Sequence, residues 1–103
     1  MATIMQLHWP EATKEQYERI RQIANWEGDR PEGAQLHVVG FSEDGMRILD
    51  IWDSPEAFNT FFERRIGPAV QEVGVEGQPD VRMFPLHGVY APAFGREEQT
   101  ATL

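Results

Sequence analysis

The sequence predicts a single domain of the α+β class. Three observations support this prediction. The chain has 103 residues, the size of one domain. Two amphipathic stretches each follow a capping residue, and short apolar runs occur before, between and after them. Hydrophobic residues make up 41% of the chain and charged residues 25%, a globular mixture that argues against disorder.

The first half of the chain reads as a strand followed by a helix. Residues 1–9 are rich in Ile, Met, Leu and Trp, and Pro10 ends this strand. Thr13 then opens a helix, because Thr13 and Gln16 have the spacing of a capping box. The apolar stripe of this helix consists of Tyr17, Ile20, Ile23 and Ala24. Gly28 is expected to stop it, and a loop follows.

The second half of the chain reads as a hairpin, a helix and a last strand. The remaining predicted elements are strands at residues 34–41, 46–53 and 80–88 and a helix that begins at Ser54. Asp44-Gly45 is a strong hairpin signal. Ser54 caps the second helix and Pro55 takes its first position. The apolar stripe of this helix consists of Phe58, Phe61, Phe62, Ile66, Ala69, Val70 and Val73. Gly67-Pro68 should kink or restart it midway.

The element order is therefore β-α-β-β-α-β, which is a ferredoxin-like unit. Right-handed crossovers place both helices on one face of a four-stranded antiparallel sheet. We expect one domain at residues 1–91. Residues 92–103 form a polar tail without periodicity, expected to be loose or packed on a neighbour.

Composition excludes several functions. Nine Lys and Arg against seventeen Asp and Glu give a net charge of −8, which argues against nucleic acid and against an anionic membrane surface as partners. The chain has no cysteine, so disulfides, thiolate zinc sites and a Cys nucleophile are excluded. No apolar run reaches the ~20 residues of a membrane span, and a basic signal-peptide region is missing. We therefore expect a cytoplasmic location.

Alternation along the strands sorts their residues into two faces. One set is apolar throughout and is expected beneath the helices: Met5, Leu7, Leu36, Val38, Gly40, Leu49, Ile51, Phe84 and Leu86. The other set is mixed: Ile4, Gln6, His8, His37, Val39, Phe41, Ile48, Asp50, Trp52, Met83, Pro85 and His87. Large apolar groups with a few polar ones are typical of a ligand pocket.

The hairpin brings three residues of the mixed face together. A two-residue loop at Asp44-Gly45 places Val39 opposite Asp50, whereas a four-residue loop places His37 opposite Asp50. Both registers keep His37, Asp50 and Trp52 on one face. A carboxylate beside an imidazole fixes its tautomer and raises its basicity, so this pair is a candidate for proton abstraction. The structural alternatives are a core histidine bonded to a carbonyl and a carboxylate bonded to the backbone or to an arginine.

Three segments carry a resemblance to a known family. They are the stretch from His37 to Phe58, the Arg65-Ile-Gly-Pro-Ala69 segment and the closing Met83-Phe-Pro-Leu-His87. With the element order, they resemble the dimeric α/β-barrel superfamily across residues 2–90. The resemblance is closest to its antibiotic-biosynthesis-monooxygenase-like branch, which has many small bacterial members. It implies a homodimer in which two sheets pack face to face and close a barrel.

The resemblance implies several activities and does not choose between them. Members include cofactor-free quinone-forming monooxygenases, haem-degrading enzymes, isomerases and polyketide cyclases. The cofactor-free members commonly use an Asn and a Trp with an Arg or Tyr nearby. Here Trp52 and Arg82 are the counterparts, whereas Asn25 and Asn59 lie on helices away from the predicted pocket. Haem-degrading members bind iron through a helix His, which this chain lacks.

These observations lead to one set of candidate residues and three hypotheses. The candidate catalytic residues are His37, Asp50 and His87, and the candidate substrate-binding residues are Gln6, His8, Val39, Phe41, Ile48, Trp52 and Met83. His8 and His87 have alternative interpretations as exposed or interface residues. No metal-ligand spacing occurs, so neither metal nor other cofactor is expected. The first hypothesis is a small-molecule enzyme, a monooxygenase, cyclase or isomerase acting on an aromatic or polyketide-like substrate. The alternatives are a binding module for an apolar metabolite and a structural or stress-related dimer with a filled interior.

Overall fold

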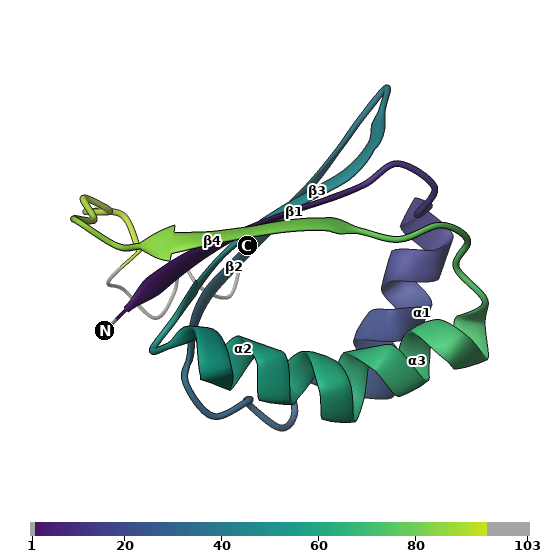
Figure 1. Cartoon of the computed structure of the whole chain (residues 1–103), viewed down its shortest axis with the longest axis horizontal. Coiled ribbons are helices and arrows are strands. Elements are labelled where there is room, and N and C mark those ends of the chain that lie inside the picture. The colour runs from purple at the N-terminus through teal and green to yellow at the C-terminus, as the bar shows by residue number, and fades with distance from the viewer. Residues whose placement is uncertain (1, 95–103) are drawn as a thin grey trace.

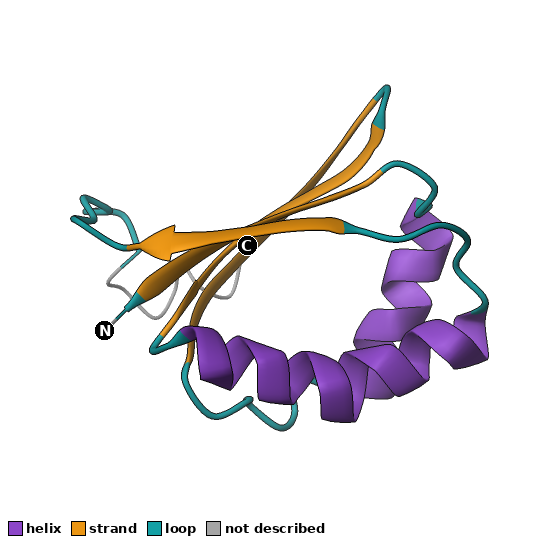
Figure 2. Ribbon diagram, in the orientation of Figure 1, coloured by secondary structure: helices purple, strands orange, loops and turns teal. Residues whose placement is uncertain are grey.

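The computed structural model of the chain describes residues 2–94 and has the predicted element order. Its elements are β1 (Thr3–Trp9), α1 (Lys14–Ala24), β2 (Ala34–Ser42), β3 (Gly45–Trp52), α2 (Pro55–Phe61), the π-helical turn η1 (Phe62–Ile66), α3 (Gly67–Val73) and β4 (Asp80–Pro85). The strands form one antiparallel sheet in the order β2-β3-β1-β4. The helices lie together on one side of it (Figures 1 and 2). The predicted ferredoxin-like α+β fold is confirmed. Of the predicted tail, residues 95–103 lie outside the described residues.

Helix α1 begins as predicted and ends earlier. The Thr13 hydroxyl accepts a hydrogen bond from the Gln16 N–H (3.1 Å), and the Gln16 side chain accepts one from the Thr13 N–H (3.0 Å). The helix ends at Ala24 because Asn25 adopts the left-handed conformation with a φ of 52°. The predicted stop at Gly28 is wrong, since Asn also tolerates this conformation and reaches the end of the helix first.

The second helix contains a wider turn where the sequence predicts a break. The Ser54 hydroxyl accepts the N–H of Ala57 (3.1 Å) and so caps α2. Pro68 has no N–H, and its ring disfavours an ordinary α-helical turn before it. The chain widens there into η1, in which the Gly67 N–H bonds to the carbonyl of Phe62, five residues earlier. The helix therefore continues as α3 through a π-turn.

The β2–β3 hairpin has the register that pairs the candidate acid and base. Ser42 stands opposite Gly45, and His37 stands opposite Asp50. Gly45 has a φ of 109°, and a Cβ at this position would collide with the backbone of Pro10. Glycine is therefore required where the chain leaving β1 crosses the hairpin.

The face prediction is wrong for β1 and for the side that the helices cover. Met5 stands opposite both Asp50 and Met83, so these residues share the helix-covered face with His37. The mixed face, and not the uniformly apolar one, therefore lies beneath the helices. The outer face carries Ile4, Gln6 and His8 together with Leu36, Val38, Gly40, Leu49, Ile51 and Phe84. The error arises because β1 and β3 are joined through α1 and β2, so no local turn sets their register.

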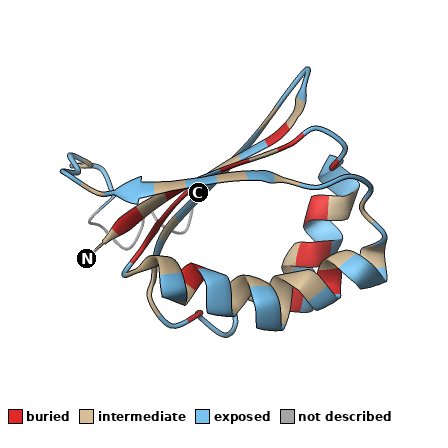
Figure 3. Ribbon diagram, viewed as in Figure 1, coloured by how far each residue is buried: buried red, intermediate tan, exposed pale blue. Residues whose placement is uncertain are grey.

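The core lies between the central strands and the helices, where Figure 3 shows buried residues. It is built around Met5, Trp9, Trp52 and Phe58, which are all at most 6% exposed. In the predicted stripe of α1, Tyr17, Ile20 and Ala24 are buried, whereas Ile23 is 41% exposed and lies outside it. No helix within residues 2–94 is long and apolar enough to cross a membrane.

Candidate functional site

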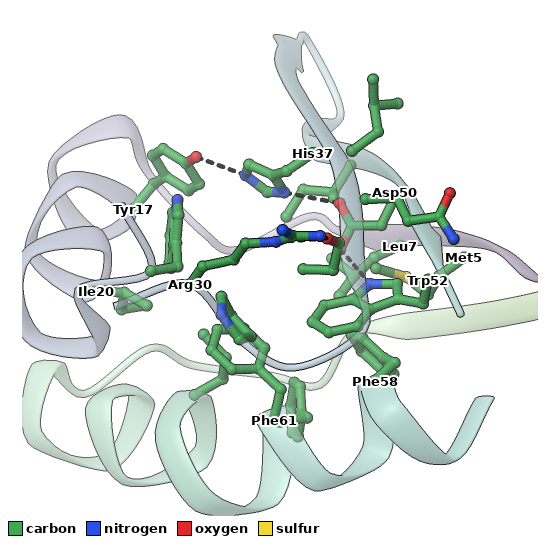
Figure 4. Close-up of a pocket in the computed structure, with 18 of the residues that line it drawn as sticks. Met5, Leu7, Tyr17, Ile20, Arg30, His37, Asp50, Trp52, Phe58 and Phe61 are labelled. Atoms are coloured by element: carbon green, nitrogen blue, oxygen red, sulfur yellow. Dashed lines mark hydrogen bonds and ion pairs between the residues drawn. The ribbon is translucent and has the colours of Figure 1, made fainter. Parts of the chain in front are cut away.

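A cavity of about 570 Å³ lies between the sheet and the helices. Met5 and Leu7 of β1 line it on one side, and Phe58 and Phe61 of α2 line it on another (Figure 4). Pockets for small molecules typically have about 300–1,000 Å³, and one water molecule occupies only about 30 Å³ of liquid. The interior is therefore not filled by the protein's own side chains, in contrast to the third hypothesis.

A chain of hydrogen bonds joins four side chains at the wall of this cavity (Figure 4). The indole Nε1–H of Trp52 donates to Oδ2 of Asp50 (3.0 Å). Oδ1 of Asp50 bonds to Nδ1 of His37 (2.7 Å), and Nε2 of His37 bonds to the hydroxyl of Tyr17 (2.7 Å). The chain thus runs from β3 through β2 to α1.

Local structure explains why these four side chains meet. His37 and Asp50 are directly paired across the hairpin, and Trp52 follows Asp50 by two residues, which keeps it on the same face. Tyr17 lies one helical turn after the Thr13 cap, on the buried stripe of α1 that faces the sheet. The hairpin register and the helix cap together therefore set the geometry of the site.

The surroundings define which group donates in each hydrogen bond. The Asp50 side chain is only 7% exposed and accepts from both neighbours, as an ionised carboxylate does. When His37 is neutral, it carries its proton on Nδ1 and accepts at Nε2. Burial raises the pKa of Tyr17 to about 12, so its hydroxyl keeps its proton and donates to Nε2. In this series of hydrogen bonds, Tyr17 donates to His37 and His37 donates to the buried carboxylate of Asp50.

Aromatic rings surround the acid–base chain. The Trp26 ring lies edge-on to His37 at 5.3 Å between ring centres, and it lies 5.8 Å from Tyr17. The Trp52 ring lies 5.5 Å from Phe61. Rings of this kind provide flat apolar surfaces with polar edges. The cavity is therefore suited to a flat aromatic ligand.

The structure brings some predicted site residues together and separates others. His37, Ile48, Asp50 and Trp52 line the cavity. Phe41 packs edge-on against Tyr17 at 6.2 Å, and Val39 and Met83 pack against the core cluster. Gln6, His8 and His87 do not reach the cavity: the first two lie on the outer face, where His8 Nε2 contacts the Asp44 carbonyl (2.8 Å), and His87 lies beyond the end of β4.

Two site residues are missing from the sequence-based prediction. The helical spacing places Tyr17 in the apolar stripe of the first helix, and it gives Trp26 no role. The available signal is the hydroxyl of Tyr17, since a buried phenol needs a hydrogen-bond partner. Trp26 follows the left-handed Asn25, and no sequence pattern indicates which way the chain turns there.

The titratable groups do not form a metal centre in the part of the chain that the structure describes. Within residues 2–94, no three His, Asp or Glu side chains come close enough together to hold a metal ion. His37 has one carboxylate neighbour, Asp50, and its other nitrogen faces Tyr17. This arrangement is typical of proton transfer rather than metal ligation.

The fold and the site define a class of protein: a small ferredoxin-like domain whose sheet and helices enclose an aromatic-lined cavity with an acid–base chain. No protein-family model matches the sequence, and no curated protein is significantly similar to it. Solved structures share the fold.

SnoaB, a cofactor-independent oxygenase from Streptomyces nogalater, superimposes with a TM-score of 0.59 at 12% identity, over 85% of this chain and 94% of its own. A candidate antibiotic biosynthesis monooxygenase from Chloroflexus aurantiacus gives 0.59 at 17% identity, over 87% and 96% of the two chains. A dimeric ferredoxin-like protein of unknown function from Thermobifida fusca gives 0.59 at 12%, over 84% and 92%. The chain therefore has the fold of the antibiotic-biosynthesis-monooxygenase-like proteins, as the resemblance implied.

Proposed function

We propose that the protein is a small-molecule enzyme that removes a proton from a flat aromatic or polyketide-like substrate in the cavity. The observation that carries this proposal is the hydrogen-bond chain from buried Asp50 through His37 to Tyr17 at an apolar wall. A buried carboxylate stabilises the imidazolium that forms when His37 takes a proton. The named oxygenases among the structural neighbours support this general kind of activity.

The resting hydrogen bonds define the route of the proton. Nε2 of His37 already accepts from the Tyr17 hydroxyl, so the proton of the substrate reaches it through the tyrosine oxygen. Tyr17 passes its own proton to Nε2 while its oxygen takes one from an acidic phenol or an activated C–H. The products of this step are a substrate anion, an intact Tyr17 and an imidazolium at His37 beside the Asp50 carboxylate.

The anion formed in this step is the common starting point of the reactions considered. In a monooxygenase, dioxygen is the oxidant: a CH₂ group and O₂ give a carbonyl and water, with one oxygen atom in each product. In a cyclase or an isomerase, the same anion attacks or is reprotonated elsewhere without an oxidant. Among these, the neighbouring cofactor-independent oxygenase favours the oxygen reaction.

A non-catalytic binding module is the second candidate. It is favoured by the fact that both ring nitrogens of His37 are hydrogen-bonded to protein side chains, which is how a structural histidine is held. In this case Tyr17, His37 and Asp50 shape the cavity wall and the ligand leaves unchanged.

The two candidates are separated by comparing turnover with binding. Anthrone and a cyclic 1,3-dicarbonyl compound are suitable probes, with oxygen uptake and product absorbance as readouts. His37→Ala should lower turnover on the order of 10²–10⁴-fold. His8→Ala is the matched control, because His8 lies on the outer face of the sheet. Turnover by His37→Ala at the parent rate excludes the proposed chemistry, and binding without turnover in the parent favours the second candidate.

We also propose that the protein is a homodimer. The mixed face, whose apolar residues would be the simplest surface to bury against a second copy, lies beneath the helices, so we place the interface on the outer face of the sheet. Val38, Leu49 and Phe84 are exposed there, at 52%, 37% and 40%. Contiguous exposed apolar side chains typically mark an interface. The dimeric neighbour from Thermobifida fusca supports this proposal. Light scattering should give a mass twice the 11.8 kDa of one chain, and the Leu49→Arg variant should have the mass of a monomer. A monomeric mass for the parent at micromolar concentration contradicts the proposal.

A further inference from the structure

Among residues 2–94, Arg30 is the only Lys or Arg that lines the cavity. It is an exposed residue of the loop between α1 and β2, and Figure 4 shows its side chain extending from that loop over the cavity. The described cavity wall is otherwise apolar apart from the acid–base chain and two polar residues at its edge, Glu27 and Gln35. A cation at this place needs an explanation in a chain with a net charge of −8.

The guanidinium of Arg30 is held on one side and open on the other. Its Nε and Nη2 donate to the carbonyl of Ala34, at 3.1 and 2.8 Å. A guanidinium has five N–H donors, so these two bonds leave three. The free donors include both N–H groups of Nη1. Among the residues that the structure describes, Arg30 has no carboxylate within ion-pair distance.

The two acidic residues that line the described cavity wall, Glu27 and Asp50, are already engaged with other side chains. Glu27 makes a two-pronged ion pair with Arg21, at 2.6 and 2.7 Å. Asp50 is bonded to His37 and Trp52. The fork of Arg30 is thus the one cationic donor set that the described cavity wall offers to a ligand.

The loop that carries Arg30 is pinned in place from the second helix. Arg65 donates to the carbonyls of Asn25 (3.1 Å) and Asp29 (2.8 Å), and it stacks over the Phe61 ring at 5.1 Å. Bonds from Arg65 to the carbonyl of Ala24 fix the end of α1 in the same way. A donor held on a fixed loop loses little conformational freedom when a ligand binds.

We propose that Arg30 binds a carboxylate of the ligand, so that the cavity takes flat aromatic compounds that carry an acidic group. The free fork of a guanidinium matches the two oxygens of a carboxylate. The aromatic body then lies among Trp26, Trp52 and Phe61 on the same wall. This inference rests on the proposed function only in placing a ligand in this cavity. It does not require that the ligand react.

Two probes of equal size and shape test the inference. They are 2-naphthoate, which carries a carboxylate, and 2-naphthamide, which does not. Quenching of tryptophan fluorescence measures the binding of each, since Trp26 and Trp52 line the cavity. The parent should bind naphthoate about tenfold more tightly than naphthamide, and this ratio should fall as salt is added.

Substitutions of Arg30 test whether this residue causes the tighter binding of naphthoate. Arg30→Gln should bring the ratio to about one without weakening naphthamide binding, and Arg30→Lys should leave part of it, because a lysine keeps the charge and loses the fork. Arg19→Gln is the matched control: Arg19 is an exposed residue of α1 outside the cavity wall, and the ratio should stay at about ten. Circular dichroism checks that each variant is folded.

The outcomes separate this inference from the proposed function. A ratio near one in the parent, or an unchanged ratio in Arg30→Gln, overturns the role of Arg30 even if the enzyme turns anthrone over. A carboxylate preference that depends on Arg30, together with no turnover of any probe, supports carboxylate binding by Arg30 and contradicts the proposed reaction.

Discussion

Replacing Asp50 by Asn tests the direction of the hydrogen-bond chain with a change of one atom. Asp50 accepts from two donors, whereas an amide accepts at its oxygen and donates from its nitrogen. Trp52 Nε1 is only a donor, so the amide oxygen has to face it. The amide nitrogen then faces Nδ1 of His37, and His37 takes the tautomer with its proton on Nε2, pointing at the oxygen of Tyr17.

This reversal predicts a variant that is stable and inactive. In this variant Tyr17, His37, the residue at position 50 and Trp52 all remain hydrogen-bonded to one another. Only the negative charge of the carboxylate is lost. The free energy of unfolding should fall by about 1 kcal/mol. Turnover should fall on the order of 10²–10⁴-fold, because Nε2 is now protonated and no longer accepts.

Urea unfolding and turnover of anthrone measure the two quantities. Asp50→Ala is the comparison variant: it leaves the indole N–H of Trp52 without its acceptor in a residue that is 3% exposed. It should therefore lose about 1–3 kcal/mol more than Asp50→Asn. The tautomer reasoning is refuted if Asp50→Asn works at the parent rate, or if it is as unstable as Asp50→Ala.

Three further predictions concern stability. Burial raises the pKa of Tyr17 from 10.0 to about 12, so the free energy of unfolding of the parent should fall as the pH rises from about 10 to about 12. Tyr17→Phe should remove this loss. Urea unfolding midpoints at about pH 9 and about pH 11 test the prediction. Phe58→Ala should lower the free energy of unfolding by ~3–5 kcal/mol, because Phe58 is 6% exposed, whereas half-buried Phe62 should lose less; equal losses in chemical denaturation would show that the buried side of the helix is misassigned. Gly45→Ala should lose about 1–3 kcal/mol in thermal or urea unfolding, and Gly40→Ala, where a Cβ meets nothing within 4 Å, should be nearly neutral.

Features that depend on neighbouring residues can be predicted from the sequence. The Thr13 capping box, the Ser54 cap and the order of the elements all follow from short patterns. The pairing of His37 with Asp50 is one of the two registers considered, but it arises from a two-residue turn at Glu43 and Asp44, and the predicted turn at Asp44-Gly45 is displaced by one residue. Half of the acid–base chain can therefore be predicted from the amino-acid sequence alone.

The rest of the site depends on contacts between distant segments. Alternation divides each strand into two faces, but the faces of different strands match only through their register, and β1 pairs with strands far from it in sequence. The sequence pattern favours the uniformly apolar face beneath the helices, because His37 and Asp50 are polar. That expectation fails because a cavity lies between the sheet and the helices there, and the polar groups at its wall are paired with one another by hydrogen bonds. Tyr17 is likewise misread when only its apolar ring is considered.

The π-turn η1 makes the length of the second helix difficult to change. Phe62 and Ile66, the first and last residues of η1, both line the cavity, and Arg65 within it reaches the loop that carries Arg30. Deletion of one residue before Pro68 would force an ordinary α-helical turn on the segment, which the Pro68 ring disfavours, and insertion of one residue would turn everything beyond it by about 100°. Ala69, which is fully buried, would leave its place against the core. Related chains that keep this cavity should therefore tolerate substitutions in residues 62–66 more readily than insertions or deletions.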